Sequence, residues 1–295
     1  MSSVLSRYLN PDVLSQIADR SIDPRGLVVG NLAGAHKSPL SGFAVEFAGH
    51  REYVPGDDPK HVDWRVYFSR DKYFVKQYEL ETNFVCHLIV DISASMRYGE
   101  GQQQKMLYAS QMATALAYSI IKQSDKVSFA TFDTQIRGAL TPSNALHQVT
   151  RITQHLDEIE PLEKTRISDS LSDLAARIGR REIVMLFTDF FGDLDGLEST
   201  LQRLRYDQHE VVLFHVLHHD ERSFDFDEMT KFVGLEVDEI LMAQPDDVRR
   251  GYLDALQKLT TQLEEIALRN RCEFVPVDTS RSMSELLADY INQRG

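Results

Sequence analysis

The sequence predicts an α/β protein: a doubly wound, mostly parallel sheet preceded by a small β-rich module. From residue 83 onward, short apolar runs alternate with segments that repeat apolar residues every three or four positions. The run 84–90 is apolar throughout most of its length, which is typical of a strand covered on both faces. Repeated alternation of strands and helices favours a parallel sheet with helices on both sides.

We expect two domains. Residues 1–82 would hold an N-terminal helix and the β-rich module, and residues 83–295 would form the α/β domain. The helix would lie within residues 1–20, with Asn10 as N-cap and Pro11 at the first helical position. The module contains three β-like runs separated by Gly and Pro turns, at 27–29, 44–47 and 73–78.

The α/β domain is predicted to contain six strands, of which only the third returns antiparallel after the turn at Asp133 and Thr134. The strands are expected at 84–90, 127–132, 135–140, 182–188, 211–217 and 273–277. Helical periodicity is found around 106–120, 146–159, 167–178, 196–207, 252–266 and 282–292. The acidic segment 220–247 is interpreted as a solvated excursion.

The composition of the chain argues against several classes of function. The formal net charge is -13 with a pI of about 5.2, which disfavours nonspecific binding to nucleic acid or to an anionic membrane. Cys86 and Cys272 have neither disulfide-framework nor zinc spacing, so we expect two reduced thiols. The N-terminus lacks the apolar core of a signal peptide, and no apolar stretch is long enough to span a membrane. These observations predict a cytoplasmic protein without direct membrane insertion.

The residues that point to chemistry directly follow the first strand of the α/β domain. Asp91, Ser93 and Ser95 place one carboxylate and two hydroxyls on a tight turn, and such hard oxygens are ligands for Mg²⁺. Thr165 stands at the beginning of a helix, and Asp189 follows a later strand. In doubly wound sheets ligands bind where the strand order reverses, so all five side chains converge if those two strands are neighbours. The alternative interpretation is a strand-end turn with capping hydroxyls.

This pattern resembles the metal-ion-dependent adhesion site of von Willebrand factor A domains, which have a Rossmann-type sheet. The resemblance implies that Ser93, Ser95 and Thr165 contact Mg²⁺ (or Mn²⁺ or Ca²⁺), and that Asp91 and Asp189 act directly or through water. It also implies that a partner's Glu or Asp completes the metal shell. Many such domains have Gly-Gly before the threonine and Gly after the last aspartate, whereas Glu163-Lys164 and Phe190 stand here.

The strings in the first hundred residues are similar to those of the family called domain of unknown function 58. They are Gly-Ala-His-Lys-Ser-Pro-Leu-Ser-Gly at 34–42, Arg-Glu-Tyr-Val-Pro-Gly-Asp-Asp at 51–58 and Asp-Trp-Arg at 63–65. Members resemble this chain in placing such a segment ahead of a von Willebrand A-like domain. Their genes often lie beside MoxR-type AAA+ ATPases, which implies a role as an adaptor or co-chaperone.

We therefore expect a non-catalytic, metal-dependent interaction protein whose partner is a MoxR-type AAA+ ATPase or its client. One alternative is a Mg²⁺-dependent phosphotransferase or hydrolase using Asp91, although Ser93 stands where that chemistry commonly needs a second Asp. The other is an interaction protein with an idle metal site. Partner contacts are predicted at Arg51, Asp57, Asp58, Trp64, Phe190 and Phe191. The alternatives are a turn and ion-pair framework for the three charged residues, a packing anchor for Trp64, and burial of the two phenylalanines.

Overall fold

The computed structural model describes residues 2–18, 20–25, 33–38, 46–70, 72–159, 178–226, 229–235 and 240–294. The chain forms two compact units. Residues 1–25 and 85–295 form the larger unit, and residues 26–84 form the smaller one. This division corrects the predicted one, because the N-terminal segment belongs with the α/β domain and not with the β-rich module.

The larger unit is built on a six-stranded sheet, as predicted. Its strands are β4 (Val85–Asp91), β5 (Lys126–Phe132), β6 (Ile136–Ser143), β7 (Ile183–Thr188), β8 (Glu210–Leu217) and β11 (Glu273–Asp278). The strand order is β11-β8-β7-β4-β5-β6, and every neighbouring pair is parallel except β5 with β6. The order reverses at the parallel pair β4 and β7, so the carboxyl ends of these two strands form the topological switch point.

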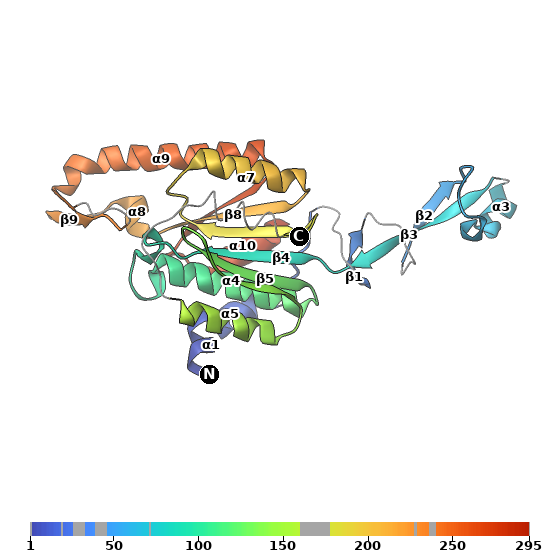
Figure 1. Cartoon of the computed structure of the whole chain (residues 1–295), viewed down its shortest axis with the longest axis horizontal. Helices are drawn as coiled ribbons and strands as arrows, with labels where there is room; N and C mark the ends of the chain where they lie inside the picture. Colours follow the sequence, from blue (N-terminus) through green and yellow to red (C-terminus); the bar gives the residue numbers. More distant parts are fainter. Residues whose placement is uncertain are drawn as a thin grey trace. The chain divides into compact units, whose positions relative to one another are not determined.

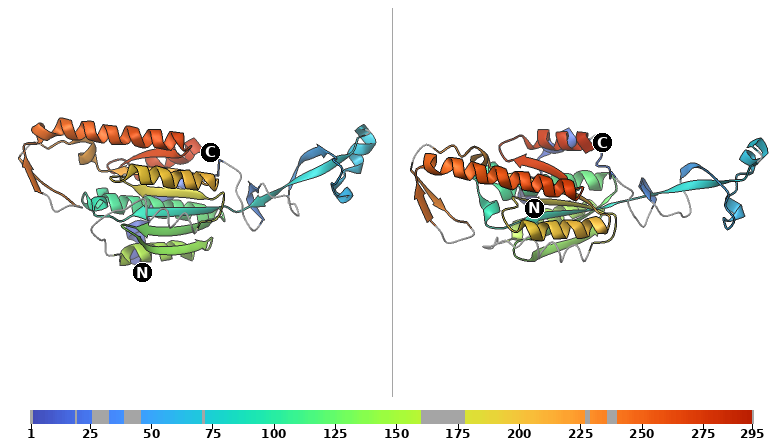
Figure 2. Two further views of the ribbon diagram at one scale, coloured as in Figure 1. Left: turned by 45° about the horizontal axis from the view of Figure 1, so that its top comes forward. Right: turned by 90° about the horizontal axis from the view of Figure 1, so that it is seen from above.

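Helices cover both faces of this sheet. The longer ones are α4 (Lys105–Lys122), α5 (His147–Glu158), α7 (Leu194–Tyr206), α9 (Pro245–Arg269) and α10 (Met283–Arg294). Figure 1 shows α7 and α9 on one face and α4 and α5 on the other. In both views of Figure 2, α7 and α9 again lie side by side. Their leucines share one buried cluster with Ile89 and Leu213 of the sheet, which explains why these strands are apolar on both sides. The helix predicted at 167–178 lies, up to residue 177, outside the described residues.

The N-terminal segment forms two helices where one was predicted. These are α1 (Ser2–Tyr8) and α2 (Pro11–Ile17). As predicted, Pro11 is the first helical residue of α2 and the Asn10 side chain caps it, accepting a hydrogen bond from Asp12 N. Helix α1 packs against α4 and α5, and α2 packs against α4 and α10. Burial of Val13 and Ile17 in these contacts attaches the segment to the larger unit.

The smaller unit is a three-stranded antiparallel sheet with the order β1-β3-β2, which confirms the β-rich module. Its strands are β1 (Ala33–Ser38), β2 (Glu46–Glu52) and β3 (Phe74–Thr82). The connection from β2 to β3 contains a 3₁₀ turn, Pro59–His61, and the short helix α3 (Trp64–Arg70). The predicted β-like run at 27–29 lies outside the described residues.

The acidic segment 220–247 is more structured than predicted. A short helix α8 (His219–Ser223) follows β8, and a hairpin of β9 (Thr230–Val233) and β10 (Ile240–Ala243) leads into α9. Phe224 and Phe232 stack with ring centroids 5.5 Å apart, so the base of the hairpin has an apolar contact of its own. Most of the described residues of the segment are exposed, as expected for a solvated excursion, but they form regular secondary structure.

Replacing Arg294 with methionine is expected to lower the free energy of unfolding by about 2–3 kcal/mol. The Arg294 side chain is fully buried at the end of α10 and contacts Glu210 and Glu273, each at 2.7 Å. Its removal leaves Glu273 with only the half-exposed Arg25 side chain, at 3.4 Å, and Glu210 with only the backbone N–H of Arg25. Both carboxylates also keep some contact with water, so the loss is smaller than the ~3–5 kcal/mol of a fully buried pair. Urea unfolding measures the change.

The matched control is Arg281→Met. Arg281 pairs with Asp289 on the surface at 3.3 Å, and exposed pairs contribute about 0–1 kcal/mol. Equal losses of stability in Arg294→Met and Arg281→Met would contradict a stabilising role for the buried arginine.

Candidate metal centre

Asp91 lies at the switch point, where β4 ends, and its side chain is completely buried. Both carboxylate oxygens accept hydrogen bonds. Ser93 N donates to Oδ1 at 2.8 Å, which closes a tight turn after the strand, and Thr188 Oγ1 donates to Oδ2 at 2.6 Å from the neighbouring strand β7. These two bonds fix the orientation of the carboxylate.

The two serines lie beside this carboxylate. Ser93 is buried and its hydroxyl also hydrogen-bonds to Asp91, while Ser95 begins a 3₁₀ turn, Ser95–Arg97, and is only partly buried. The Oγ atoms of Ser93 and Ser95 lie 3.1 Å apart. The structure thus brings Asp91, Ser93 and Ser95 together as a group of hard oxygen donors.

Asp189 follows β7 and is also buried, at the same edge of the sheet as Asp91. Its Oδ2 accepts a hydrogen bond from Lys105 Nζ at 2.9 Å, and its Oδ1 accepts one from Phe191 N at 3.2 Å. Lys105 Nζ also contacts Glu221 Oε1 at 2.7 Å. A buried ammonium group therefore joins Asp189 to α8.

Sequence reasoning missed Lys105 and Glu221. Lys105 is the first residue of α4 and Glu221 belongs to α8, 116 positions later, where it also completes a capping box by accepting from His218 N at 2.8 Å. No local spacing links these positions to Asp189. The only available signal was the isolated charge of Lys105 at the start of an otherwise apolar helix.

Burial and neighbouring charges together determine the protonation of Asp91, Lys105 and Glu221. Burial raises the pKa of Asp91 to about 7, and the negative charge of Asp189 acts in the same direction, against the hydrogen bonds from Thr188 and Ser93. Burial acts to lower the pKa of Lys105, but the Asp189 and Glu221 carboxylates more than offset it, and the pKa is raised. Lys105 therefore stays charged, and burial also raises the pKa of Glu221.

The donor set fits a hard divalent cation in part. The oxygens of Asp91, Ser93 and Ser95 are the type that Mg²⁺ prefers, and they converge as a metal site requires. Asp189, by contrast, is already neutralised by Lys105, so its direct coordination would require that salt bridge to change. Thr165 lies outside the described residues. Among the described residues, those of this site included, no three His, Cys, Asp or Glu side chains form a group that could hold a metal ion.

The two phenylalanines after Asp189 have different environments. Phe190 is fully buried in the cluster formed with α7 and α9, so the prediction of a partner contact at Phe190 is wrong for this conformation. Its φ of 56° lies in the left-handed region, which glycine adopts more readily than phenylalanine. Phe191 is half-buried, and Lys105 Nζ lies 5.3 Å from the centre of its ring.

The predicted contact residues of the smaller unit hold its turns together. Arg51 Nη2 contacts Asp57 Oδ1 at 2.8 Å, and Asp57 Oδ2 accepts from Val54 N at 2.9 Å. Asp58 caps the following 3₁₀ turn through Lys60 N. These contacts favour the turn framework for Arg51, Asp57 and Asp58. Trp64 is 54% exposed, so it stays a predicted partner contact.

None of the helices in the described residues is both long enough and apolar enough to cross a membrane.

Comparisons with known proteins identify the family of the chain. The uncharacterized protein Rv1480 of Mycobacterium tuberculosis is 24% identical over 191 residues, which are 64% of this chain and 60% of that protein. The match thus spans less than two thirds of this relative's length.

Similar solved structures include the conserved hypothetical protein BatB from Bacteroides thetaiotaomicron, with 16% identity over 72% of this chain and 98% of that chain and a TM-score of 0.47. Another is the SpRpn10 VWA domain, with 11% identity over 70% of this chain and 94% of that chain and a TM-score of 0.38. Both TM-scores are low, and the fold rests on the strand order described above. A family profile matches residues 49–262, most of the chain, and the chain therefore belongs to the family described as Protein of unknown function DUF58.

Proposed function

We propose that this chain is a non-catalytic, cytoplasmic interaction protein that uses a divalent cation to bind an acidic side chain of a partner. One observation carries the proposal: a buried carboxylate, Asp91, is held between Ser93 and Thr188 beside two further hydroxyl oxygens at the switch point of the sheet. This is where doubly wound sheets bind ligands. Asp91, Ser93 and Ser95 would hold Mg²⁺, or Mn²⁺ or Ca²⁺, and Thr165 is a further candidate ligand.

The cation would supply a positive charge with an open coordination position, to which a carboxylate of the partner would bind. The residues of this chain would position the cation and remove it from bulk water. Ser93, two residues after Asp91, has no carboxylate with which to transfer a proton, and this supports binding over phosphoryl transfer. We further propose that the partner is a MoxR-type AAA+ ATPase or its client, on the strength of the family resemblance alone.

A second candidate, an interaction protein with an idle metal site, is favoured by the salt bridge between Lys105 and Asp189. An ammonium group already neutralises the carboxylate that would otherwise complete the metal shell. In that case partner binding would use either Trp64 or Phe191, and it would be indifferent to a chelator.

Affinity capture from native lysate separates the two candidates. Wild type and Asp91→Ala are compared, each with Mg²⁺ and with a chelator, and bound proteins are identified by mass spectrometry. We expect a partner that is retained only by wild type with Mg²⁺, because Asp91, unlike Asp189, is a charged candidate ligand that is not paired with Lys105. A partner captured equally in all four conditions would rule out a metal-bridged contact and favour the idle site.

A further inference from the structure

The hairpin of β9 and β10 has two faces with different contacts. Figure 1 and both views of Figure 2 show it at the N-terminal end of α9. In its register Val233 lies opposite Ile240, and Lys231 lies opposite Met242. Residues directly opposite each other in an antiparallel pair point to the same side, so these four side chains share one face of the hairpin, the outer face.

An aromatic cluster holds the opposite face of the hairpin. Phe232, which stands between Lys231 and Val233 in β9, stacks on Phe224 with ring centroids 5.5 Å apart. Phe224 is buried, and its ring centroid lies 4.7 Å from that of Tyr252 in α9. These contacts attach the hairpin to α9 through this face, and the outer face points away from them.

The outer face is apolar and largely exposed. Val233, Ile240 and Met242, together with Met229 and Leu235 next to the two ends of β9, are between 46% and 61% exposed. Apolar side chains that are exposed singly are ordinary, whereas a group of them with polar surroundings marks an interaction site. The two methionines can adapt to the shape of a partner.

The surroundings of the hairpin are acidic. Residues 220–250 contain ten Asp or Glu and four Lys or Arg, so this stretch carries -6 of the chain's net charge of -13. Asp225 precedes β9 and Asp246 follows β10, and these two exposed carboxylates share one cation, Arg249, at 3.9 and 3.3 Å. The negative charge repels an anionic membrane and a second copy of the same face, and it attracts a surface that carries Lys or Arg.

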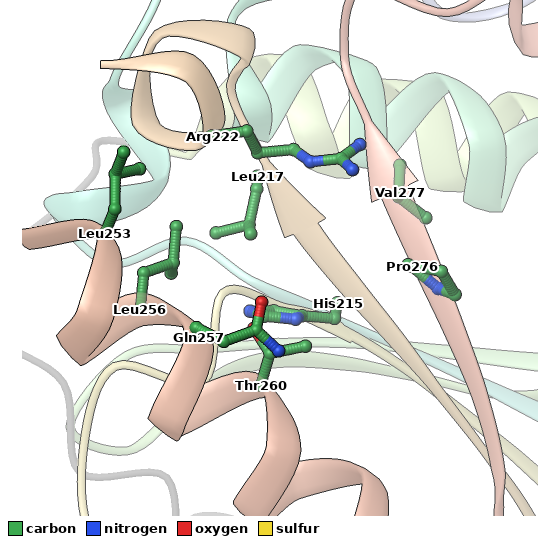
Figure 3. A pocket seen from close by; sticks show the side chains of 9 residues that line it. All are labelled: His215, Leu217, Arg222, Leu253, Leu256, Gln257, Thr260, Pro276 and Val277. Carbon is green, nitrogen blue, oxygen red and sulfur yellow. The ribbon is translucent and has the colours of Figure 1, made fainter.

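A cavity between α9, β8 and β11 offers no comparable surface. Its volume is about 250 Å³, and a void of ~150 Å³ holds one benzene ring, so the cavity can take about two side chains but not a protein segment. Figure 3 shows Leu253 and Leu256 of α9 on one side of it and Val277 of β11 on the other. The outer face is therefore the apolar surface that a partner protein can cover in this part of the chain.

We propose that the outer face docks a partner protein that presents an apolar strip bordered by Lys and Arg. Apolar contact would supply most of the binding free energy, and the acidic residues around the hairpin would select a basic partner. The hairpin follows α8, whose Glu221 reaches Lys105 beside the candidate metal centre, so both lie at the same edge of the sheet. Docking on the outer face needs no cation, and the proposal does not depend on metal binding.

Three designed peptides test this chemistry. The first is an amphipathic helix of leucine and lysine, the second has glutamate in place of every lysine, and the third has the composition of the first in an order without an apolar strip. Each peptide carries a fluorophore and is titrated with the protein in the presence of a chelator, and fluorescence anisotropy measures binding. We expect saturable binding of the first peptide, about tenfold or more tighter than that of the other two.

The double variant Val233→Thr with Ile240→Thr locates the binding. Threonine keeps the β-branched shape that suits a strand but makes the outer face polar, so the variant should keep its thermal stability and bind the lysine peptide about tenfold or more weakly. The matched control, Leu146→Thr with Leu268→Gln, changes two exposed leucines outside the hairpin and should bind like wild type, as should Leu253→Gln on the cavity wall. Unchanged affinity in the threonine variant, or equal binding of the glutamate peptide by wild type, would overturn the proposal.

Two further measurements cover the other occupants. Wild type and the threonine variant are mixed with vesicles of equal parts phosphatidylcholine and phosphatidylglycerol, and sedimentation velocity compares the self-association of the two proteins. We expect no vesicle binding and no self-association that depends on the outer face. Either interaction, if it is present in wild type and lost in the threonine variant, would overturn the proposal and assign the outer face to a membrane or to a second copy.

Discussion

Replacing Lys105 with methionine is expected to lower the free energy of unfolding by about 3–5 kcal/mol. The Lys105 side chain is fully buried between Asp189 and Glu221, whose side chains are 2% and 13% exposed. Methionine preserves most of the packing of the long side chain but leaves two buried carboxylates without a counter-charge. Chemical denaturation with urea, followed by circular dichroism, measures the loss.

Two further variants make this result specific. Lys258→Met changes an exposed lysine of the long helix α9 in the same way, and it should alter stability by less than about 0.5 kcal/mol. Adding Asp189→Asn to Lys105→Met removes one of the unpaired charges and should recover part of the loss. If Lys105→Met unfolds within about 1 kcal/mol of wild type, the buried lysine is not the group that stabilises this site.

Replacing Asp91 with asparagine is expected to abolish stabilisation by Mg²⁺. A cation that binds only the folded protein adds about 2.7 kcal/mol when its concentration is 100 times the dissociation constant. Asparagine cannot supply the negative charge that balances Mg²⁺, so the variant should gain nothing. Thermal unfolding with Mg²⁺ and with a chelator makes the comparison, and Asp195→Asn, which alters an exposed carboxylate of α7, should respond like wild type. An unchanged response in Asp91→Asn would contradict the ligand assignment.

The same variant should alter the pH dependence of stability in the absence of metal. The pKa of Asp91 is raised to about 7 by burial and by Asp189, compared with an ordinary value of about 3.9 in the unfolded chain. The folded state therefore holds the proton more tightly, and this contribution is complete below about pH 4 and is lost as the pH rises through about 7. In chelator, raising the pH from 5 to 8 should shift stability in favour of Asp91→Asn relative to wild type. A difference that is constant across this range would contradict the burial of Asp91.

Much of the fold was predictable because its signals are local. The apolar run that became β4 and the helical spacing of α4 each depend on neighbouring residues, and the six strands of the larger sheet lie close to their predicted positions along the chain. The sequence brings Asp91 and Asp189 together only if the strands that precede them are neighbours, and these strands, β4 and β7, do pair in the structure. Asp91, Ser93 and Ser95 meet because a single turn holds them.

The features that sequence reasoning missed depend on distant contacts. Lys105 reaches Asp189, 84 positions later, and Glu221, 116 positions later, and only the assembled sheet brings these residues together. The N-terminal helices were assigned to the wrong unit because the sequence gives no indication of which surface they bury. Phe190 was predicted as a partner contact because two adjacent phenylalanines in a loop carry no signal of the left-handed backbone that turns Phe190 into the core.

Direct counting of bound Mn²⁺ tests the central claim most simply, because free and bound Mn²⁺ give different electron paramagnetic resonance spectra. We predict one saturable Mn²⁺ site per chain in wild type. Asp91→Asn and Ser93→Ala should each bind Mn²⁺ at least tenfold more weakly. Neither variant should become saturated at the Mn²⁺ concentrations that saturate wild type. Equal binding by all three proteins, or no binding by wild type at millimolar Mn²⁺, would contradict the claim that Asp91, Ser93 and Ser95 hold a divalent cation.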